Sequence, residues 1–201
     1  MTYDRVRAHT MVPQWKYYDN CRIAEDVRGI PGCVVECGVW KGGMSAGLFL
    51  TLGPERTYYL LDGFQGLPPA QEIDGASALQ WQAATASPKY YNNCKASAAE
   101  ASAIMQEVGC YNFHIIEGWL ADTLPSFNPG PIALLRLDVD WHEATLLCLN
   151  QLYGRVVHGG VIIFDDYDAW DGCRIAVDSF IGWKNVNRFG DAYYHTKEVQ
   201  T

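Results

Sequence analysis

Three aspartates lie at the ends of two apolar, strand-like runs in the second half of the chain. Asp138 ends one run, and the adjacent pair Asp165 and Asp166 ends the other. In an open α/β sheet the carboxyl ends of the strands face the ligand crevice, so these carboxylates are expected to meet there. Carboxylates that share one site repel each other unless a cation lies between them. These hard oxygen ligands therefore predict a site for Mg²⁺, or for Mn²⁺, although capping of helix N-termini is the ordinary alternative.

Two more residues with useful chemistry follow Asp138 closely. Asp140 is either a group that orients the metal ligands without binding the metal itself or an acid at a helix N-terminus. His142 lies on the same stretch and is a candidate for a hydrogen bond to a substrate. A single histidine is more often an ordinary surface or core residue, so both roles stay open for it.

A glycine-rich turn follows an earlier apolar run, in the segment Val34-Val35-Glu36-Cys37-Gly38-Val39-Trp40-Lys41-Gly42-Gly43. Glycines permit a tight turn and let a ligand approach the backbone closely. The spacing is not Gly-x-Gly-x-x-Gly, so a dinucleotide is a poor fit. Glu36 followed by Gly38 suits a ligand with an amino-acid end, such as S-adenosylmethionine, because the carboxylate can meet an ammonium group. The alternative is a plain turn between a strand and a helix.

Two other strand ends carry residues that suit a nucleoside. Asp62 can accept hydrogen bonds from both ribose hydroxyls, as acids at this place do in many nucleotide-binding α/β folds. NAD enzymes share that feature, so it does not identify the cofactor. Gly118 and Trp119 end the third strand-like run, where an adenine ring commonly lies. Trp119 is equally compatible with a place in the core.

Apolar runs alternate with helical stretches along the chain and must position these residues. The expected strands are 33–38, 57–62, 113–117, 132–138 and 161–165, and the expected helices are 16–28, 43–52, 95–108, 144–156 and 172–181. Runs that are apolar throughout are typical of strands covered on both faces. The alternation predicts an α/β fold with a doubly wound, mostly parallel sheet and helices on both faces.

Other segments have distinct expected roles. Residues 63–94 begin with turn-forming residues, and a long insertion after a strand is usually functional or mobile, so we expect it to cover the site. The stretch 183–197 is expected to form a strand pair at the edge of the sheet. The length predicts a single domain over 1–201, in which 1–30 forms a helical N-terminal arm.

Composition excludes several classes of protein. The chain is 49% hydrophobic and 19% charged, so it can bury a core. A net charge of −8 disfavours nucleic acid as a partner. No apolar run approaches the length of a membrane span, and the N-terminus lacks the apolar core of a signal peptide. The seven cysteines contain no Cys-x-x-Cys pair, which favours reduced thiols in a cytoplasmic protein.

A series of short motifs occurs in order between about residues 10 and 180. They are Thr10-Met11-Val12, Gly29-Ile30-Pro31-Gly32, the 34–43 turn, Asp62-Gly63-Phe64-Gln65-Gly66-Leu67-Pro68, Glu117-Gly118-Trp119, Asp122-Thr123-Leu124-Pro125, Leu135-Arg136-Leu137-Asp138-Val139-Asp140, Gly159-Gly160, Asp165-Asp166-Tyr167 and Cys173-Arg174-x-Ala176-Val177-Asp178. On these motifs the chain resembles the macrocin O-methyltransferase family, which methylates sugar hydroxyls of macrolides and aminocoumarins.

The resemblance implies a Rossmann-like class I methyltransferase sheet of seven strands that uses S-adenosylmethionine and Mg²⁺. It implies that Asp138 is both a metal ligand and the general base, and that Asp165 and Asp166 complete the protein ligands. Met11 would contact the methionine end of the cofactor. The other residues expected to line the cofactor are Glu36, Gly38, Ser45, Asp62, Gly118 and Trp119.

The chain departs from the family pattern in two places. Where Leu-Tyr-Glu-Ser-Thr is expected after the Asp-x-Asp pair, this chain has the run 141–145, Trp-His-Glu-Ala-Thr. The N-terminal arm is also shorter than in family members. Both differences lie near the expected metal and acceptor, so the acceptor cannot be carried over from the family.

We therefore expect an O-methyltransferase that deprotonates and aims one hydroxyl of a vicinal diol, on the sugar of a glycosylated natural product. A phenolic or catechol diol would use the same metal geometry. Asp138-x-Asp140 also fits a metal-dependent glycosyltransferase or a phosphatase with an aspartate nucleophile, and a non-catalytic binder could keep the cofactor fold. The expected partner is a small-molecule acceptor. A possible second partner is another copy of the chain, in a homodimer formed through apolar surface. Nucleic acid and membranes are not expected as partners.

Overall fold

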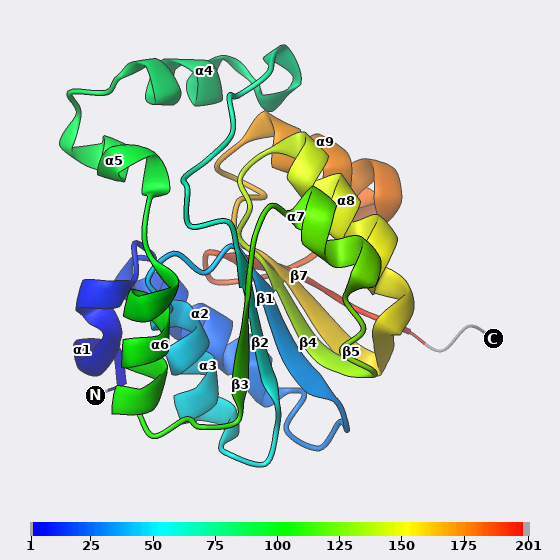
Figure 1. Cartoon of the computed structure of the whole chain (residues 1–201). Helices are drawn as coiled ribbons and strands as arrows, with labels where there is room; N and C mark the ends of the chain where they lie inside the picture. The colour runs from blue at the N-terminus through cyan, green and yellow to red at the C-terminus, as the bar shows by residue number, and fades with distance from the viewer. Residues whose placement is uncertain (1, 199–201) are drawn as a thin grey trace.

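A computed structural model of the chain describes residues 2–198 and contains a seven-stranded sheet (Figure 1). Residues 1 and 199–201 of the predicted single domain lie outside the described residues. The strands are β1 (Cys33–Cys37), β2 (Tyr58–Asp62), β3 (Phe113–Glu117), β4 (Ile132–Leu137), β5 (Val156–Phe164), β6 (Asn187–Phe189) and β7 (Ala192–Thr196). The α-helices are α1 (Thr2–Val6), α2 (Gln14–Glu25), α3 (Gly43–Leu52), α4 (Ala76–Ala83), α5 (Tyr91–Cys94), α6 (Ala98–Glu107), α7 (Leu120–Thr123), α8 (His142–Leu152) and α9 (Asp171–Phe180).

The strand order is β3-β2-β1-β4-β5-β7-β6, which reverses direction between β1 and β4. The pairs from β3 to β5 are parallel, whereas β7 is antiparallel to both β5 and β6. The prediction of a doubly wound, mostly parallel sheet is confirmed. So is the strand pair expected in 183–197, which forms the β6–β7 edge. Ligands of such sheets bind at the carboxyl ends of the strands beside the point of reversal.

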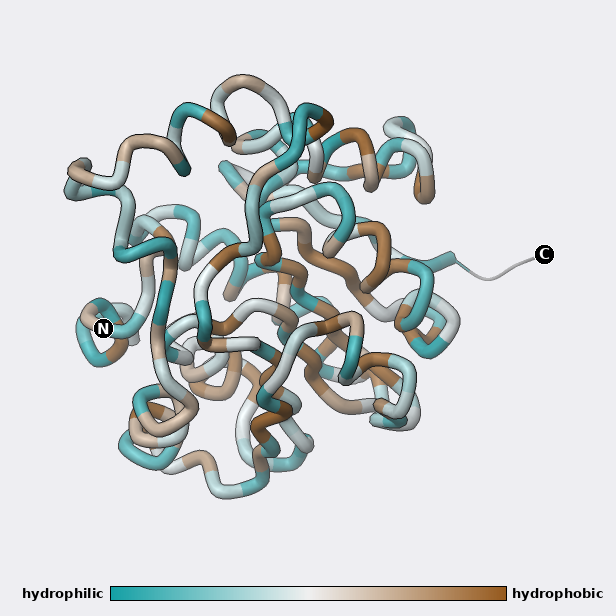
Figure 2. The backbone as a smooth tube through the Cα atoms, turned by 45° about the horizontal axis from the view of Figure 1, so that its top comes forward, coloured by the Kyte–Doolittle hydropathy of each residue, from teal (hydrophilic) through white to brown (hydrophobic). Residues whose placement is uncertain are grey.

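Helices cover both faces of the sheet, with α2, α3 and α6 on one side and α8 and α9 on the other (Figure 1). Every residue of β1 is buried, and alternate side chains belong to different cores. Val34 packs in the core with α2 and α3, and Val35 packs in the core with α8 and α9. Each such side chain contributes roughly 1.5–3 kcal/mol by leaving water. Figure 2 shows the hydrophobic stretches gathered in the middle of the molecule.

One strand is longer than the sequence predicts. β5 begins at Val156, whereas an apolar run is recognisable only from Val161. The intervening residues include His158 and two glycines, which break the apolar pattern. They belong to the strand because the backbones of Gly159 and Gly160 pair with Lys197, although Gly159 itself has φ +77°. Only the tertiary contact with the C-terminal part of the chain identifies this half of the strand.

The remaining structural expectations concern thiols and membranes. All seven cysteines are free thiols, and six of them are buried. Within residues 2–198, no helix is both long enough and apolar enough to cross a membrane.

Candidate active site

A cavity of about 600 Å³ opens at the carboxyl ends of the central strands. Its walls include Glu36 in β1, Asp62 at the end of β2 and Asp138 after β4. The N-terminal arm contributes Met11 and neighbouring residues, and the segment 63–94 contributes side chains from above the strand ends (Figure 1). Residues between positions 9 and 170 therefore converge on one cavity, as the sheet topology predicts.

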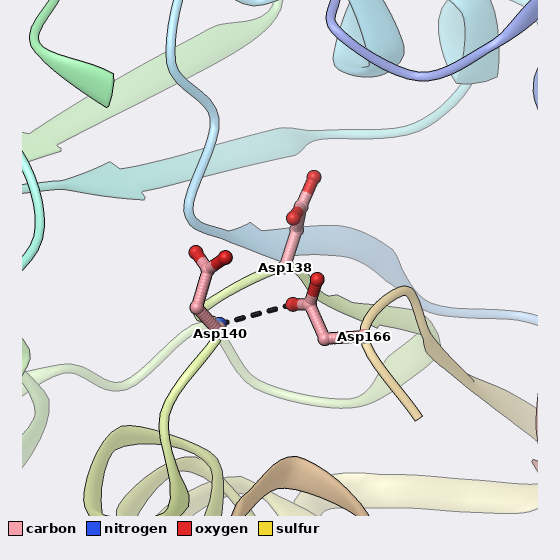
Figure 3. Close-up of side chains that lie close together, drawn as sticks. All are labelled: Asp138, Asp140 and Asp166. Atoms are coloured by element: carbon pink, nitrogen blue, oxygen red, sulfur yellow. Dashed lines mark hydrogen bonds between the residues drawn. The ribbon is translucent and has the colours of Figure 1, made fainter. Parts of the chain in front are cut away.

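Three carboxylates cluster in this cavity (Figure 3). One oxygen from each of Asp138, Asp140 and Asp166 lies within 4.8 Å of the others. The backbone of Asp140 adopts a left-handed conformation, with φ 59°, and its N–H donates to Asp166 Oδ2 at 2.9 Å. The indole of Trp170 donates to Asp140 Oδ1 at 2.9 Å. This turn brings Asp140 to the cluster.

Asp165 also lines the cavity, and its predicted role as a metal ligand beside Asp138 and Asp166 stays a prediction. Its carboxylate accepts a short hydrogen bond from Arg136, and its Oδ2 lies 3.6 Å from Lys16 Nζ. Burial alone would raise the pKa of Asp165, but the positive charges of Arg136 and Lys16 outweigh burial and lower it. Asp165 thus faces two cations of the protein, while Asp140 joins the three-carboxylate cluster.

Arg136 also contacts Asp138, but in the three clustered acids burial and nearby negative charges outweigh positive charge from the protein. Burial, followed by the negative charge of Asp165, raises the pKa of Asp138 to about 8. Burial also raises the pKa of Asp140 to about 7. The pKa of Asp166 is raised well above its ordinary value by burial and by repulsion from Asp140 and Asp138. Three oxygen donors beside an open cavity fit Mg²⁺, which prefers carboxylates and keeps several waters.

A buried arginine links the strand ends. The Arg136 side chain is 0% exposed and contacts Glu36 Oε1 at 2.5 Å and Asp138 Oδ2 at 2.8 Å, as well as Asp165. Its Nε also donates to Asn20 on α2 at 3.0 Å. Because a buried charge is costly unless it is paired, this network fixes the direction of all three carboxylates.

Glu36 and Ser45 form a hydrogen-bonded pair at the predicted cofactor end. Ser45 donates a short hydrogen bond to Glu36 Oε2, while Arg136 occupies the other oxygen. Glu36 lines the cavity, but Ser45 is buried behind it and does not. Contact between the cofactor and Ser45 therefore stays a prediction. The buried position of the Ser45 hydroxyl does not favour it.

Asp62 holds the glycine turn in shape. Its Oδ2 accepts from the N–H groups of Val39 and Trp40, each at 2.8 Å, and its Oδ1 accepts from Phe64 at 2.7 Å. The residue also lines the cavity, where ribose binding was expected. Each carboxylate oxygen has more than one lone pair, so the ribose contact stays a prediction beside this structural role.

The other predicted residues divide into those that reach the cavity and one that does not. Met11, Gly38, Trp119 and His142 all line it, and Trp119 is 39% exposed. Gly118 lies outside the lining, where a side chain would meet Thr123. The N–H of His142 donates to Asp74 Oδ1 at 2.8 Å, which ties the segment 63–94 to the start of α8.

A sequence profile of the macrocin-O-methyltransferase family matches residues 4–189. The chain belongs to this family. A relative from Streptomyces niveus, demethyldecarbamoylnovobiocin O-methyltransferase, is 32% identical over 184 residues, covering 86% of this chain and 68% of the relative. A relative from Streptomyces olivaceus, 8-demethyl-8-(2,3-dimethoxy-alpha-L-rhamnosyl)-tetracenomycin-C 4'-O-methyltransferase, is also 32% identical, covering 87% of this chain and 68% of its own.

Solved structures give the same result. The O-methyltransferase NovP superposes with a TM-score of 0.78 at 28% identity, covering 95% of this chain and 83% of NovP. The calicheamicin methyltransferase CalS11 shares the fold, with a TM-score of 0.72 at 19% identity. The match covers 97% of this chain and 91% of CalS11. The predictions of the family, of its S-adenosylmethionine-binding class I fold and of O-methyltransferase activity are confirmed. The metal stays a prediction.

Arg136 and the tryptophans around Asp140 were missed as site residues from the sequence. Arg136 interrupts an otherwise apolar run that becomes a fully buried strand. A charged residue at such a position must have buried partners, so this interruption was a usable signal. The contact between Trp170 and Asp140 joins residues 30 positions apart and had no comparable signal.

Gly38 is a position where the sheet admits no side chain. Its φ is +80°, and an added Cβ would lie 1.7 Å from the Asp138 carbonyl oxygen. We expect Gly38→Ala to lower the free energy of unfolding well beyond the roughly 1–2 kcal/mol that the backbone conformation alone costs. Thermal unfolding of the purified variant measures the loss.

Gly53→Ala is the matched control for this prediction. Gly53 has φ +86°, but its added Cβ would have no neighbour within 4 Å. Gly53→Ala therefore measures the loss of stability caused by a positive φ alone, without a clash such as that with Asp138. Equal losses of Tm in the two variants would contradict the close approach of β1 and β4.

Proposed function

We propose that the protein transfers a methyl group from S-adenosylmethionine to one hydroxyl of a vicinal diol on a sugar, using Mg²⁺ or Mn²⁺. The observation that carries the proposal is the carboxylate cluster of Asp138, Asp140 and Asp166 in the cavity that also contains Met11 and Gly38. Two vicinal oxygens can bind one cation together, which fixes the oxygen that faces the methyl group.

The printed names of the relatives support a natural-product acceptor. The Streptomyces olivaceus relative methylates a 4' oxygen of a tetracenomycin derivative that carries a rhamnosyl group. A further relative, from Micromonospora griseorubida, is a mycinamicin III 3''-O-methyltransferase and is 29% identical over 184 residues. Because one of these acceptors carries a rhamnosyl group, a glycosylated acceptor is the first class to test here.

In this mechanism the protein chiefly deprotonates and aims the acceptor. When bound, S-adenosylmethionine would supply a sulfonium methyl with a good leaving group, and a divalent cation held by the three carboxylates would acidify the acceptor hydroxyl. Asp138 takes the proton from that hydroxyl as general base. Arg136 holds Asp138 Oδ2 at 2.8 Å, which leaves us to assign Oδ1 to the acceptor. Two hydrogen bonds hold Asp140 and Asp166 in place: Trp170 donates to the Asp140 carboxylate, and the Asp140 N–H donates to the Asp166 carboxylate.

The proposal is tested by calorimetric titration with S-adenosylmethionine, followed by methyl-transfer assays on a panel of sugar diols and catechols with Mg²⁺. Cofactor binding with methylation of a sugar diol is the expected result. Methylation of catechols alone would move the acceptor to the phenolic class. Absence of cofactor binding, together with use of a UDP-sugar, would favour the glycosyltransferase alternative, and hydrolysis of an aryl phosphate would favour the phosphatase.

A separate experiment tests whether Asp140 or Asp165 binds the metal. We expect Asp140→Asn to weaken Mn²⁺ binding by roughly 10–100-fold, because it removes a charged ligand of the cluster. Asp165→Asn should weaken binding less, since Arg136 and Lys16 already engage that carboxylate. Mn²⁺ titration followed by electron paramagnetic resonance measures both affinities.

Asp168→Asn is the control for this pair, because Asp168 lies 3.8 Å from Lys16 and is 44% exposed. It should bind Mn²⁺ as the unmodified protein does. A larger loss of affinity in Asp165→Asn than in Asp140→Asn would restore the ligand set of Asp138, Asp165 and Asp166 that the sequence predicts.

A further inference from the structure

Three tryptophans from separate parts of the chain meet at the cavity. Trp81 lies on α4, Trp141 directly precedes α8, and Trp170 directly precedes α9. The ring centroids of Trp141 and Trp170 are 5.4 Å apart, and those of Trp81 lie 6.3 Å and 6.1 Å from them. All three side chains line the cavity.

The rings meet at steep angles. The interplanar angles are 70° for Trp81 with Trp141, 60° for Trp81 with Trp170 and 65° for Trp141 with Trp170. The three pairs therefore make edge-to-face or tilted contacts and not parallel stacks. Trp141 is 2% exposed and lies behind the other two, which are partly exposed.

The polar edge of each ring is already engaged. Trp81 Nε1 donates to the carbonyl of Lys89 at 2.9 Å, and Trp141 Nε1 donates to that of Pro68 at 3.0 Å. Trp170 Nε1 donates to Asp140 in the carboxylate cluster. Because the Nε1 groups are bonded within the protein, Trp81 and Trp170 offer the cavity apolar carbon surface, and Trp170 is bonded directly to a proposed metal ligand.

The surroundings of the rings match this character. Leu67, Pro69 and Ile73 of the segment 63–94 line the cavity with them. The polar neighbours Gln71 and Glu143 also line it, but they hydrogen-bond each other at 3.3 Å. The site thus has a charged end at the aspartates and an apolar end at the tryptophans.

We propose that Trp81 and Trp170 form a stacking platform for the ring that carries the acceptor diol, and that Trp81 determines acceptor specificity. The proposal rests on the proposed methyl transfer and adds the class of acceptor, a ring with a flat apolar face beside the diol. With the diol held at the aspartates, the ring extends along the tryptophan faces. Both a deoxygenated sugar face and a catechol ring have this chemistry.

The test compares Trp81→Phe with Trp81→Leu in the full chain. Phenylalanine keeps a ring face, whereas leucine keeps apolar bulk without one, and both lose the bond to Lys89. The contribution of an aromatic contact predicts a roughly 2- to 12-fold higher acceptor KM for Trp81→Leu than for Trp81→Phe. The affinity for S-adenosylmethionine, measured by calorimetry, should be the same in both variants.

Leu79→Ala is the control, because Leu79 lies on the same helix, is 40% exposed and does not line the cavity. It should leave acceptor KM unchanged. Equal acceptor KM values for the two Trp81 variants would overturn the platform, and so would an equal loss of cofactor affinity and acceptor affinity. Catechol and sugar-diol arms of the assay show which ring is used. If the unmodified protein methylates no diol, the proposed function fails, a result separate from the Trp81 comparison.

Discussion

Asp138→Asn is expected to reduce methyl transfer by about 10²–10⁴-fold, the range that general acid–base catalysis contributes. The carboxamide keeps the shape of the side chain but cannot take the proton of the acceptor hydroxyl. Loss of one negative ligand from the cluster with Asp140 and Asp166 adds to the effect. The rate under saturating cofactor and acceptor, measured by mass spectrometry of the methylated product, gives the loss.

Cofactor binding separates this effect from misfolding. Arg136 keeps two other carboxylate partners, Glu36 and Asp165, so the fold of the variant should persist. S-Adenosylmethionine affinity is therefore expected to match that of the unmodified protein. Asp138→Asn protein that binds the cofactor and transfers methyl groups at the full rate would show that another group takes the proton.

The location of the site was predictable because it follows from the order and direction of the strands. Apolar runs identified all five strands from β1 to β5, and the parallel topology brings their carboxyl ends to one edge. Asp62, Asp138 and Asp166 line one cavity for that reason. The antiparallel edge was predictable from its apolar and aromatic residues, although the first half of β5 was not.

The ligand set was less predictable because it depends on side-chain direction. Asp165 and Asp166 follow β5 in a turn, so the sequence does not indicate in which direction each side chain points. Arg136 and Asp138 lie two positions apart and share a face, which accounts for their contact. The left-handed backbone of Asp140, which brings it into the cluster, is uncommon for a residue other than glycine. No pattern in the sequence indicates it.

The tryptophan platform shows a second limit of the sequence. Trp141 is one of the residues at which the chain departs from its family pattern. The departure indicates a different acceptor site but does not indicate the contacts of Trp141. Trp81 lies in a segment whose role as a cover stays a prediction, and Trp170 precedes a separate helix. Their contact depends on where the segment 63–94 places α4 above the strand ends (Figure 1), and no pattern in the sequence indicates that position.

The most direct test of the central claim is methyl transfer to a sugar diol after exhaustive removal of divalent cations. Because the clustered carboxylates need a cation to hold and acidify the acceptor, we expect transfer to be lost and to return when Mg²⁺ is added. S-Adenosylmethionine should still bind the metal-free protein, since its predicted contacts at Met11 and Gly38 do not involve the cation. Transfer that continues undiminished in the presence of chelator would contradict the metal site formed by Asp138, Asp140 and Asp166.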